Sequence, residues 1–142
     1  MGKKRIVAQA GTTPDAPKAS VTPGSKKKFT HGILYIQSTY NNTKLTLADS
    51  GGETLAWSSS GSLGFKGAKK GTTFAAGKVG EFMADKAASM GIKEVEVVIK
   101  GVGSGRESSM RAFAGKGIGL SAIKDSTPIP FNGPKPKKPR RV

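Results

Sequence analysis

The sequence predicts one α/β domain with a mixed β-sheet and two helices, and a basic extended arm at each end of it. Residues 29–131 alternate runs of strand period and helical period in the order β-β-β-α-β-α-β. A length of 142 residues with 35% hydrophobic content suits a single modest core. The flanking segments 1–28 and 132–142 contain too few apolar residues to join that core.

The first three strands are expected to form an antiparallel meander over residues 31–58. Residues 31–38 carry apolar side chains at both alternations, which predicts a mostly buried strand. Tyr40-Asn-Asn-Thr43 supplies a turn, because Asn tolerates left-handed backbone angles. Leu45 and Leu47 alternate with polar residues in the second strand, and residues 54–58 form the third. Trp57 is most simply core, or a lid on this sheet.

The first helix is expected to follow the Gly- and Ser-rich segment 58–71. Thr72 or Thr73 is its predicted N-cap, and Gly91 its C-terminal glycine. Between them, apolar residues recur at helical spacing and predict the buried stripe: Ala75, Val79, Phe82, Met83, Ala87 and Met90.

The remaining elements are a strand over 94–100, a second helix over 106–114 and a last strand over 118–124. Four aliphatic residues in 94–100 predict a strand covered on most of both faces. Residues 101–105 form a glycine-rich loop, which we expect to be flexible. Right-handed crossovers then join the later strands in a mixed sheet, an arrangement expected to be ribonuclease-H-like.

The net charge of +15 is concentrated at the two ends of the chain. Residues 1–28 carry a net charge of +6 and residues 132–142 a net charge of +5, whereas residues 29–131 contribute only +4. Such segments either stay solvated or neutralise a polyanion, which recovers the cost of confining them by releasing counterions. Basic arms at both ends of a compact domain favour nucleic-acid phosphates. Neither arm has the apolar face that an interfacial membrane helix needs.

The composition also argues against several classes of protein. The chain has no cysteine and one histidine, His31, which argues against disulfide scaffolds, thiol catalysis and Cys- or His-rich metal sites. No apolar run is long enough to span a bilayer, and the basic start lacks the apolar segment of a secretory signal. We therefore expect a soluble, cytoplasmic protein without cofactor, metal or membrane span.

Two glycine-containing loops precede the two helices and carry cations. Glycines let backbone N–H groups approach an anion such as phosphate closely, and the N-terminus of the following helix favours negative charge. Residues 66–73 contain three lysines, and residues 101–106 end in Arg106. A dinucleotide-binding pattern fails there, because the glycines it requires are replaced by Arg106 and Ser108. A nucleotide-dependent enzyme, with Asp125 as the ribose-binding acid, remains a third interpretation.

Six short segments occur in an order that resembles the bacterial family of small-subunit ribosomal protein S-eleven. They are Tyr40-Asn-Asn-Thr43, Gly64-Phe-Lys-Gly67, Thr73-Phe-Ala-Ala76, Gly101-Val-Gly-Ser-Gly-Arg-Glu-Ser108, Asp125-Ser-Thr-Pro-Ile-Pro130 and Asn132-Gly133, before a basic C-terminus. The resemblance implies a protein on the platform of the small subunit that bridges helices of ribosomal RNA and lines the messenger-RNA (Shine-Dalgarno) cleft. It also implies contacts with small-subunit proteins numbered seven and eighteen, and proximity to initiation factor three. Val102, Ser104, Phe131 and Lys66 depart from the family pattern.

We therefore predict a non-catalytic ribosomal RNA-binding protein, with a free-standing RNA- or DNA-binding chaperone as the alternative. Its predicted RNA-binding residues lie on the first turn, the two loops, the second helix and the C-terminal arm: Asn41, Asn42, Lys44, Lys66, Gly67, Lys69, Lys70, Thr72, Thr73, Gly103, Gly105, Arg106, Arg111, Lys116, Asn132, Lys135, Lys137, Lys138, Arg140 and Arg141. Asn132 precedes a glycine, which favours succinimide formation and a candidate isoaspartate, as the resemblance also implies.

Overall fold

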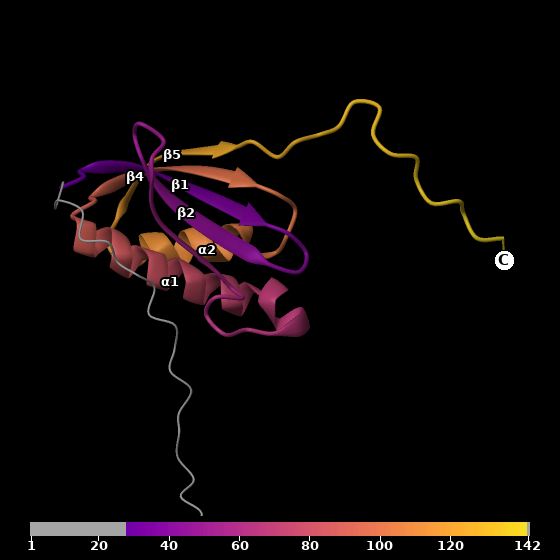
Figure 1. The fold of residues 1–142 in the computed structure, drawn as a ribbon, viewed down its shortest axis with the longest axis horizontal. Coiled ribbons are helices and arrows are strands. Elements are labelled where there is room, and N and C mark those ends of the chain that lie inside the picture. The colour runs from indigo at the N-terminus through magenta and orange to yellow at the C-terminus, as the bar shows by residue number, and fades with distance from the viewer. Residues whose placement is uncertain (1–27, 142) are drawn as a thin grey trace, which may run out of the picture.

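The computed structural model describes residues 28–141 and contains a five-stranded mixed sheet and two α-helices (Figure 1). The strands are β1 (His31–Ser38), β2 (Thr43–Asp49), β3 (Thr54–Ser59), β4 (Glu94–Lys100) and β5 (Gly119–Asp125), and the helices are α1 (Thr73–Met90) and α2 (Gly105–Ala114). A short 3₁₀ helix, η1 (Gly67–Gly71), which the sequence did not predict, precedes α1. The predicted α/β class and element order are confirmed. Of the proposed N-terminal arm, residues 1–28, only residue 28 is described, and residues 1–27 lie outside the described part of the chain.

The sheet has the strand order β3-β2-β1-β4-β5, with β1 at its centre. β1 pairs antiparallel with β2, so that Leu34 lies opposite Leu47 and Ile36 opposite Leu45, all on one face. β1 also pairs parallel with β4, and β4 pairs parallel with β5. The meander and the later parallel strands therefore share one sheet, as predicted.

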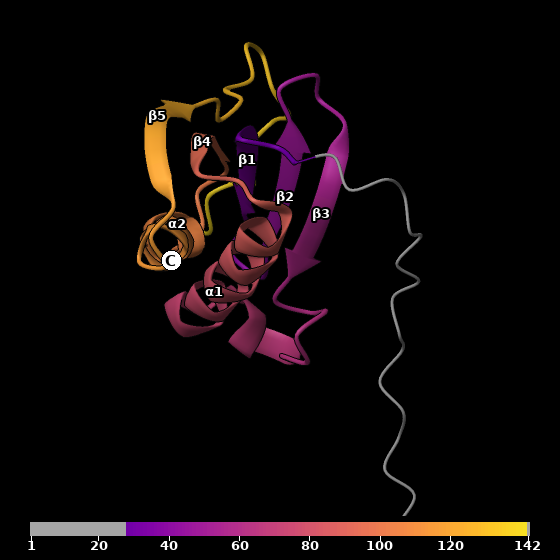
Figure 2. The same ribbon diagram turned by 90° about the vertical axis from the view of Figure 1, so that its left-hand side faces the viewer.

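Both helices lie on the same face of the sheet (Figure 2). α1 connects β3 to β4, and α2 connects β4 to β5, between strands that run in the same direction. Both connections step across the sheet toward β5, and a right-handed crossover in a given direction always places its helix on the same side. The helices then pack closely against each other at Gly80, where a Cβ would overlap the carbonyl oxygen of Ser109.

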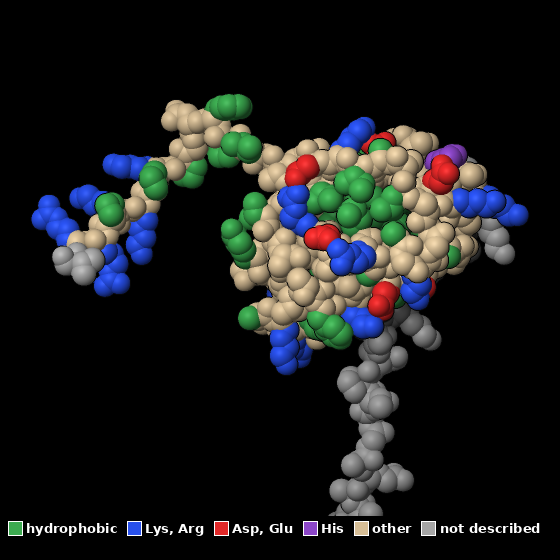
Figure 3. Space-filling view, turned by 180° about the vertical axis from the view of Figure 1, so that it is seen from behind, with side chains coloured by type: hydrophobic (Ala, Val, Ile, Leu, Met, Phe, Trp, Pro, Cys, Tyr) green, Lys and Arg blue, Asp and Glu red, His purple; other side chains and the backbone are tan. Residues whose placement is uncertain are grey.

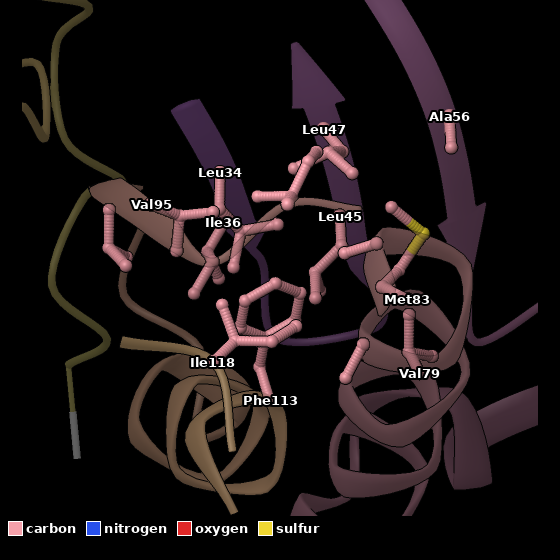
Figure 4. Close-up of a cluster of buried hydrophobic side chains, with 14 of the residues drawn as sticks. Leu34, Ile36, Leu45, Leu47, Ala56, Val79, Met83, Val95, Phe113 and Ile118 are labelled. Carbon is pink, nitrogen blue, oxygen red and sulfur yellow. The ribbon is translucent and has the colours of Figure 1, made fainter. Parts of the chain in front are cut away.

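The core fills the space between this face and the helices (Figure 4). Phe113 of α2 and Met83 of α1 are fully buried against aliphatic side chains of the central strands. α1 begins and ends as the sequence predicts. The Thr72 hydroxyl accepts a hydrogen bond from Ala75 N, and Gly91 closes the helix in the left-handed conformation with φ of 85°.

Neither α1 nor α2 lies over the other face of the sheet, which corrects two predictions. β1 and β4 alternate between buried and partly exposed residues, so neither is covered on both faces. Tyr35 and Val98 project from the uncovered face and remain partly exposed. Trp57 is 57% exposed and is not part of the core.

The β5 edge is also largely uncovered. α2 packs chiefly on α1 and β1, so β5 contributes little to the core and remains exposed along most of its length. Hydrophobic side chains gather on the side of the molecule that α2 and β5 form, among acidic and basic side chains (Figure 3). Ile123, which is 56% exposed, belongs to this edge strand.

Candidate nucleic-acid interface

The topology brings the predicted binding loops to one end of the sheet. The parallel strands β1, β3, β4 and β5 all finish at this end, and each helix begins close to the strand it follows. We call this end, formed by residues 39–42, 66–72 and 100–105, the loop edge. The chain also leaves β5 here toward the C-terminal arm (Figure 1). Two helix N-termini, which are the positive ends of the helix dipoles, therefore share one end of the sheet with the basic loops.

The loop of residues 66–72, which we call the lysine loop, has a defined geometry. Gly67 starts η1 with a positive φ of 61°, and Lys66 precedes it in an extended conformation. The Thr72 hydroxyl donates to the carbonyl of Lys69 at 2.7 Å while it caps α1, so Thr72 joins the loop to the helix. Thr73 is the first residue of α1.

The three lysines of this loop are available to an anion. Lys66 and Lys69 are exposed and Lys70 is partly buried, and among the described residues no acid pairs with any of them. Lys100, at the end of β4, is exposed at the same end and was not among the predicted binding residues. The sequence predicts Lys100 as the last residue of a strand. The alternation of a strand does not show which loops lie beside its end, so the sequence did not identify Lys100 as part of this cluster.

The first turn packs directly against the lysine loop. Asn42 closes the turn, because its carbonyl accepts from Thr39 N at 2.8 Å. Its side-chain Oδ1 is buried without a hydrogen-bond partner in the described part of the chain. Gly71 lies so close to the carbonyl of Tyr40 that a Cβ there would overlap it. Asn41 is exposed beside this contact, so the turn and the loop form one surface.

The glycine loop 101–105 is tightly packed, which corrects the expectation of a flexible loop. A Cβ on Gly103 would overlap the carbonyl oxygen of Thr39, and a Cβ on Gly105 would overlap the hydroxyl of Thr43. Gly103 N also donates to the carbonyl of Ser38 at 3.0 Å. The sequence predicts that these glycines allow a phosphate to approach. In the structure they allow the protein's own backbone and side chains to approach instead. Their role toward RNA remains a prediction.

Ser104, inside this loop, links it to the lysine loop. Its hydroxyl donates to the carbonyl of Gly71 at 3.0 Å. The first turn, the lysine loop and the glycine loop are therefore held together by close backbone packing and by this side-chain hydrogen bond.

Arg106 is engaged within the protein. Its guanidinium donates to the carbonyl of Gly101, donates to the hydroxyl of Thr127 and pairs with the carboxylate of Asp125. Hydrogen bonds from Thr127 and Arg106 lower the pKa of Asp125 from its usual 3.8 to about 2. Asp125, considered above as a ribose-binding acid, is thus occupied by groups of its own domain.

Two other predicted cations do not belong to the loop edge. Arg111 is exposed on α2 and pairs with Glu107, one turn earlier. Lys116 follows the C-terminus of α2 and pairs with Asp85 of α1 at 3.1 Å, away from the N-termini of both helices. The RNA-binding roles of Arg111 and Lys116 remain predictions, and the grouping of residues at the loop edge does not support them.

The C-terminal arm extends away from the domain (Figure 1). Its five basic residues are exposed, and no acid among the described residues pairs with them: Lys135, Lys137, Lys138, Arg140 and Arg141. Asn132, at the base of the arm, has a positive φ of 59°. The arm adds five exposed cations to those of the loop edge.

Glu94 and Glu96, which share one face of β4, are each close to a basic side chain. Glu94 lies 3.4 Å from His31, and Glu96 pairs with Lys124, both on the uncovered face. A hydrogen bond from the Lys124 ammonium to Glu96 raises the pKa of Lys124. The described residues contain no cluster of three or more potential metal ligands. Among the helices of this part of the chain, none is long and apolar enough to cross a bilayer.

Comparisons with known proteins point to one family. The sequence model of the family Ribosomal protein S11 matches residues 32–141. The small ribosomal subunit protein uS11 of Thermotoga maritima is 50% identical over 124 residues, which cover 84% of this chain and 95% of the relative. The proteins of the same name from Rippkaea orientalis and Solibacter usitatus are 48% and 50% identical and cover 88% of this chain each, and 96% and 98% of the relatives. With so much of its length matched, the chain belongs to the ribosomal protein S11 family, a structural family of the small ribosomal subunit.

Proposed function

We propose that this structural ribosomal protein, which is not an enzyme, binds small-subunit ribosomal RNA through the loop edge and the C-terminal arm. The observation that supports this proposal most strongly is that two helix N-termini lie at the same end of the sheet as a loop of three lysines, which pair with no acid among residues 28–141. The basic arm also leaves the sheet at this end. Fixed N–H donors and cations at one end suit the phosphates of an RNA backbone.

The distribution of acids supports this orientation. Asp49, Glu53 and Glu94 lie at the ends of strands opposite the loop edge, where they would repel phosphate. Near the loop edge, Asp125 and Glu107 are each paired with an arginine. The domain thus has an anion-binding end although residues 29–131 carry a net charge of only +4.

The roles within the interface differ by chemistry. Lys66, Lys69 and Lys70 contact phosphates from the lysine loop, and Asn41 contacts RNA from the first turn. Arg106 shapes the glycine loop from inside the protein. The five cations of the arm pass between RNA helices, where each phosphate they neutralise releases counterions. Specificity comes from RNA shape, because the deep groove of A-form RNA excludes side chains.

The finer placement rests on the family resemblance. It puts the protein on the platform, beside the cleft for messenger RNA and next to small-subunit proteins numbered seven and eighteen, with initiation factor three nearby. A cytoplasmic ribosome is the corresponding location. Crosslinking within assembled small subunits tests each of these neighbours.

Paired double variants test the interface. We expect Lys66→Ala with Lys69→Ala to reduce the slope of log affinity against log salt by about 1.4–1.8 for a small-subunit RNA fragment, since each lost phosphate contact accounts for about 0.7–0.9. Lys86→Ala with Lys93→Ala removes the same charge away from the loop edge and should leave the slope unchanged. Equal slopes for both double variants would contradict the proposed interface.

Co-sedimentation at high salt tests the alternative of a free-standing chaperone. A chaperone would dissociate from small subunits at high salt, whereas a ribosomal component co-sediments with them.

We also propose that Asn132 is converted to isoaspartate. Asn132 and Gly133 are both exposed at the base of the arm, and Gly133 has no side chain to hinder attack by its nitrogen. That nitrogen attacks the side-chain carbonyl of Asn132, ammonia leaves, and water opens the resulting succinimide to aspartate or isoaspartate.

A further inference from the structure

Trp57 occupies a position that the fold does not require for its core. It is the only tryptophan of the chain, and it lies on β3 opposite Thr46, on the face of the sheet that neither α1 nor α2 covers. Its side chain is 57% exposed. Leaving so large an apolar ring in water forgoes the free energy that burial would supply, so its surface is available to a partner.

A cation and two hydroxyls surround this ring. The Lys44 Nζ lies 5.8 Å from the ring centroid, within the range of a cation–π contact. Lys44, Thr46, Thr54 and Trp57 line a hollow in the surface. Among the described residues, neither threonine hydroxyl has a hydrogen-bond partner, so both can meet the polar edge of a planar ligand.

Lys44 lies at the end of the hollow nearest the loop edge in sequence. It follows Asn42 of the first turn by two residues, and that turn packs against Gly71 of the lysine loop. A polyanion bound along the loop edge therefore passes within reach of Lys44. The combination of an exposed aromatic ring, a lysine and hydroxyls on a β-sheet suits a nucleobase with its phosphate, since stacking on sheet aromatics is a general mode of binding unpaired RNA.

We propose that Trp57 and Lys44 form a stacking site for an unpaired base of RNA, whose backbone runs on to the loop edge. This site rests on the proposed function, because the RNA must first bind through its phosphates. The indole stacks on the base, and the Lys44 ammonium pairs with the adjoining phosphate. An apolar protein segment suits the hollow less well, because three of the four residues that line it, Lys44, Thr46 and Thr54, have polar side chains.

The intrinsic fluorescence of Trp57 reports on this site without a label, since the chain has no other tryptophan. The full chain is titrated with a short single-stranded RNA of mixed sequence and with an abasic oligomer of the same length. We expect quenching by the RNA and little change with the abasic oligomer, which offers phosphates but nothing to stack. Equal quenching by both oligomers would overturn the proposal.

Two variants separate stacking from folding. Trp57→Ala should weaken binding of the single-stranded RNA by about 5- to 100-fold, whereas Trp57→Phe should stay within about threefold of the original protein. The slope of affinity against salt should be unchanged in both, because no phosphate contact is lost. Circular dichroism should show the same fold in both variants, since the ring is outside the core.

The outcomes distinguish the site from the function on which it rests. If Trp57→Ala binds the RNA as tightly as the original protein, the stacking site is wrong while RNA binding through the loop edge stands. If the original protein binds neither the RNA nor the abasic oligomer, both proposals fail. A fluorescence change with small-subunit proteins but not with RNA would make the hollow a protein contact and overturn the stacking site.

Discussion

Arg106 at the start of α2 pairs with Asp125 at the end of β5, nineteen residues later in the chain. The same guanidinium donates to the carbonyl of Gly101, and Asp125 accepts from Thr127 N at 3.0 Å. The network ties the glycine loop to the point where the chain leaves the sheet. It therefore fixes the direction in which the C-terminal arm starts.

This network predicts a difference in stability between two arginine variants of one helix. Arg106→Ala should lower the free energy of unfolding by about 1–2 kcal/mol, because the partly buried carbonyl of Gly101 and the carboxylate of Asp125 both lose a charged donor. Arg111→Ala removes only an exposed pair with Glu107 and should change the stability by about 0.5 kcal/mol or less. Urea unfolding of both variants checks this, and equal effects would show that Arg106 is no more engaged than a surface arginine.

RNA binding by the Arg106 variant tests whether its guanidinium also contacts phosphate. We expect Arg106→Ala to leave the slope of affinity against salt unchanged, because several of its donors already have acceptors within the protein. A contact with phosphate would reduce the slope by about 0.7–0.9. Titrations of the RNA fragment over a range of salt concentrations distinguish these results, with Lys69→Ala as the variant expected to reduce the slope.

The lowered pKa of Asp125 predicts how the contribution of this carboxylate depends on pH. In the unfolded chain its pKa is near 3.8, and in the folded protein it is about 2. Its stabilising effect is therefore fully present above about pH 4 and is lost as the pH falls toward 2. Asp125→Asn should be less stable than the original protein at pH 7, and the two should converge near pH 2. Denaturation at a series of pH values checks this, and a constant difference would contradict the lowered pKa.

Local signals were sufficient to predict most of the fold. The cap at Thr72 and the closing Gly91 depend on neighbouring residues only, so the bounds of α1 could be predicted closely. Strand alternation likewise located the five strands. Alternation shows that a strand has two apolar faces but not which face a helix covers. Which face is covered depends on the direction in which the two crossovers pass across the sheet, and here both pass in the same direction. The sequence therefore did not predict that Trp57 and Val98 are exposed.

For the candidate site, the sequence predicted which residues lie together better than it predicted what each residue does. Lys66, Lys69 and Lys70 are near one another in sequence, and the structure keeps them together on one loop. Two of the three partners of Arg106, Asp125 and Thr127, are nineteen and twenty-one residues away, and no local pattern reveals them. Gly103 was predicted to admit a phosphate because glycine permits close approach, but sequence alone cannot show that the approaching group is the protein's own backbone.

Two glycines of α1 give a matched pair of stability predictions. Gly80→Ala should destabilise the protein by about 1–3 kcal/mol, because the new Cβ would overlap the Ser109 carbonyl where α1 and α2 meet. Gly77→Ala places its Cβ in open space in the same helix and should stabilise by about 0.5–1 kcal/mol, since alanine is the better helix former. Thermal unfolding of both variants measures the difference. Changes of the same sign would contradict the close packing of α1 on α2.

The base of the C-terminal arm predicts one site of chemical ageing. Asn132 should accumulate isoaspartate during incubation at neutral pH, because the nitrogen of Gly133 is unhindered and both residues are exposed. Asn41 and Asn42 serve as internal controls, since Asn and Thr follow them. Peptide mass spectrometry with an isoaspartyl methyltransferase assay measures the product at each position.

Gly133→Ala supplies the matched variant for this chemistry. A methyl group next to the attacking nitrogen slows succinimide formation, so isoaspartate at position 132 should form more slowly than in the original protein. Asn132 has a φ of 59° in a segment that extends away from the domain, so the reaction proceeds without disturbing the core. Unmodified asparagine at position 132 after prolonged incubation, or equal rates in both proteins, would show that the exposed Asn-Gly pair is only a turn.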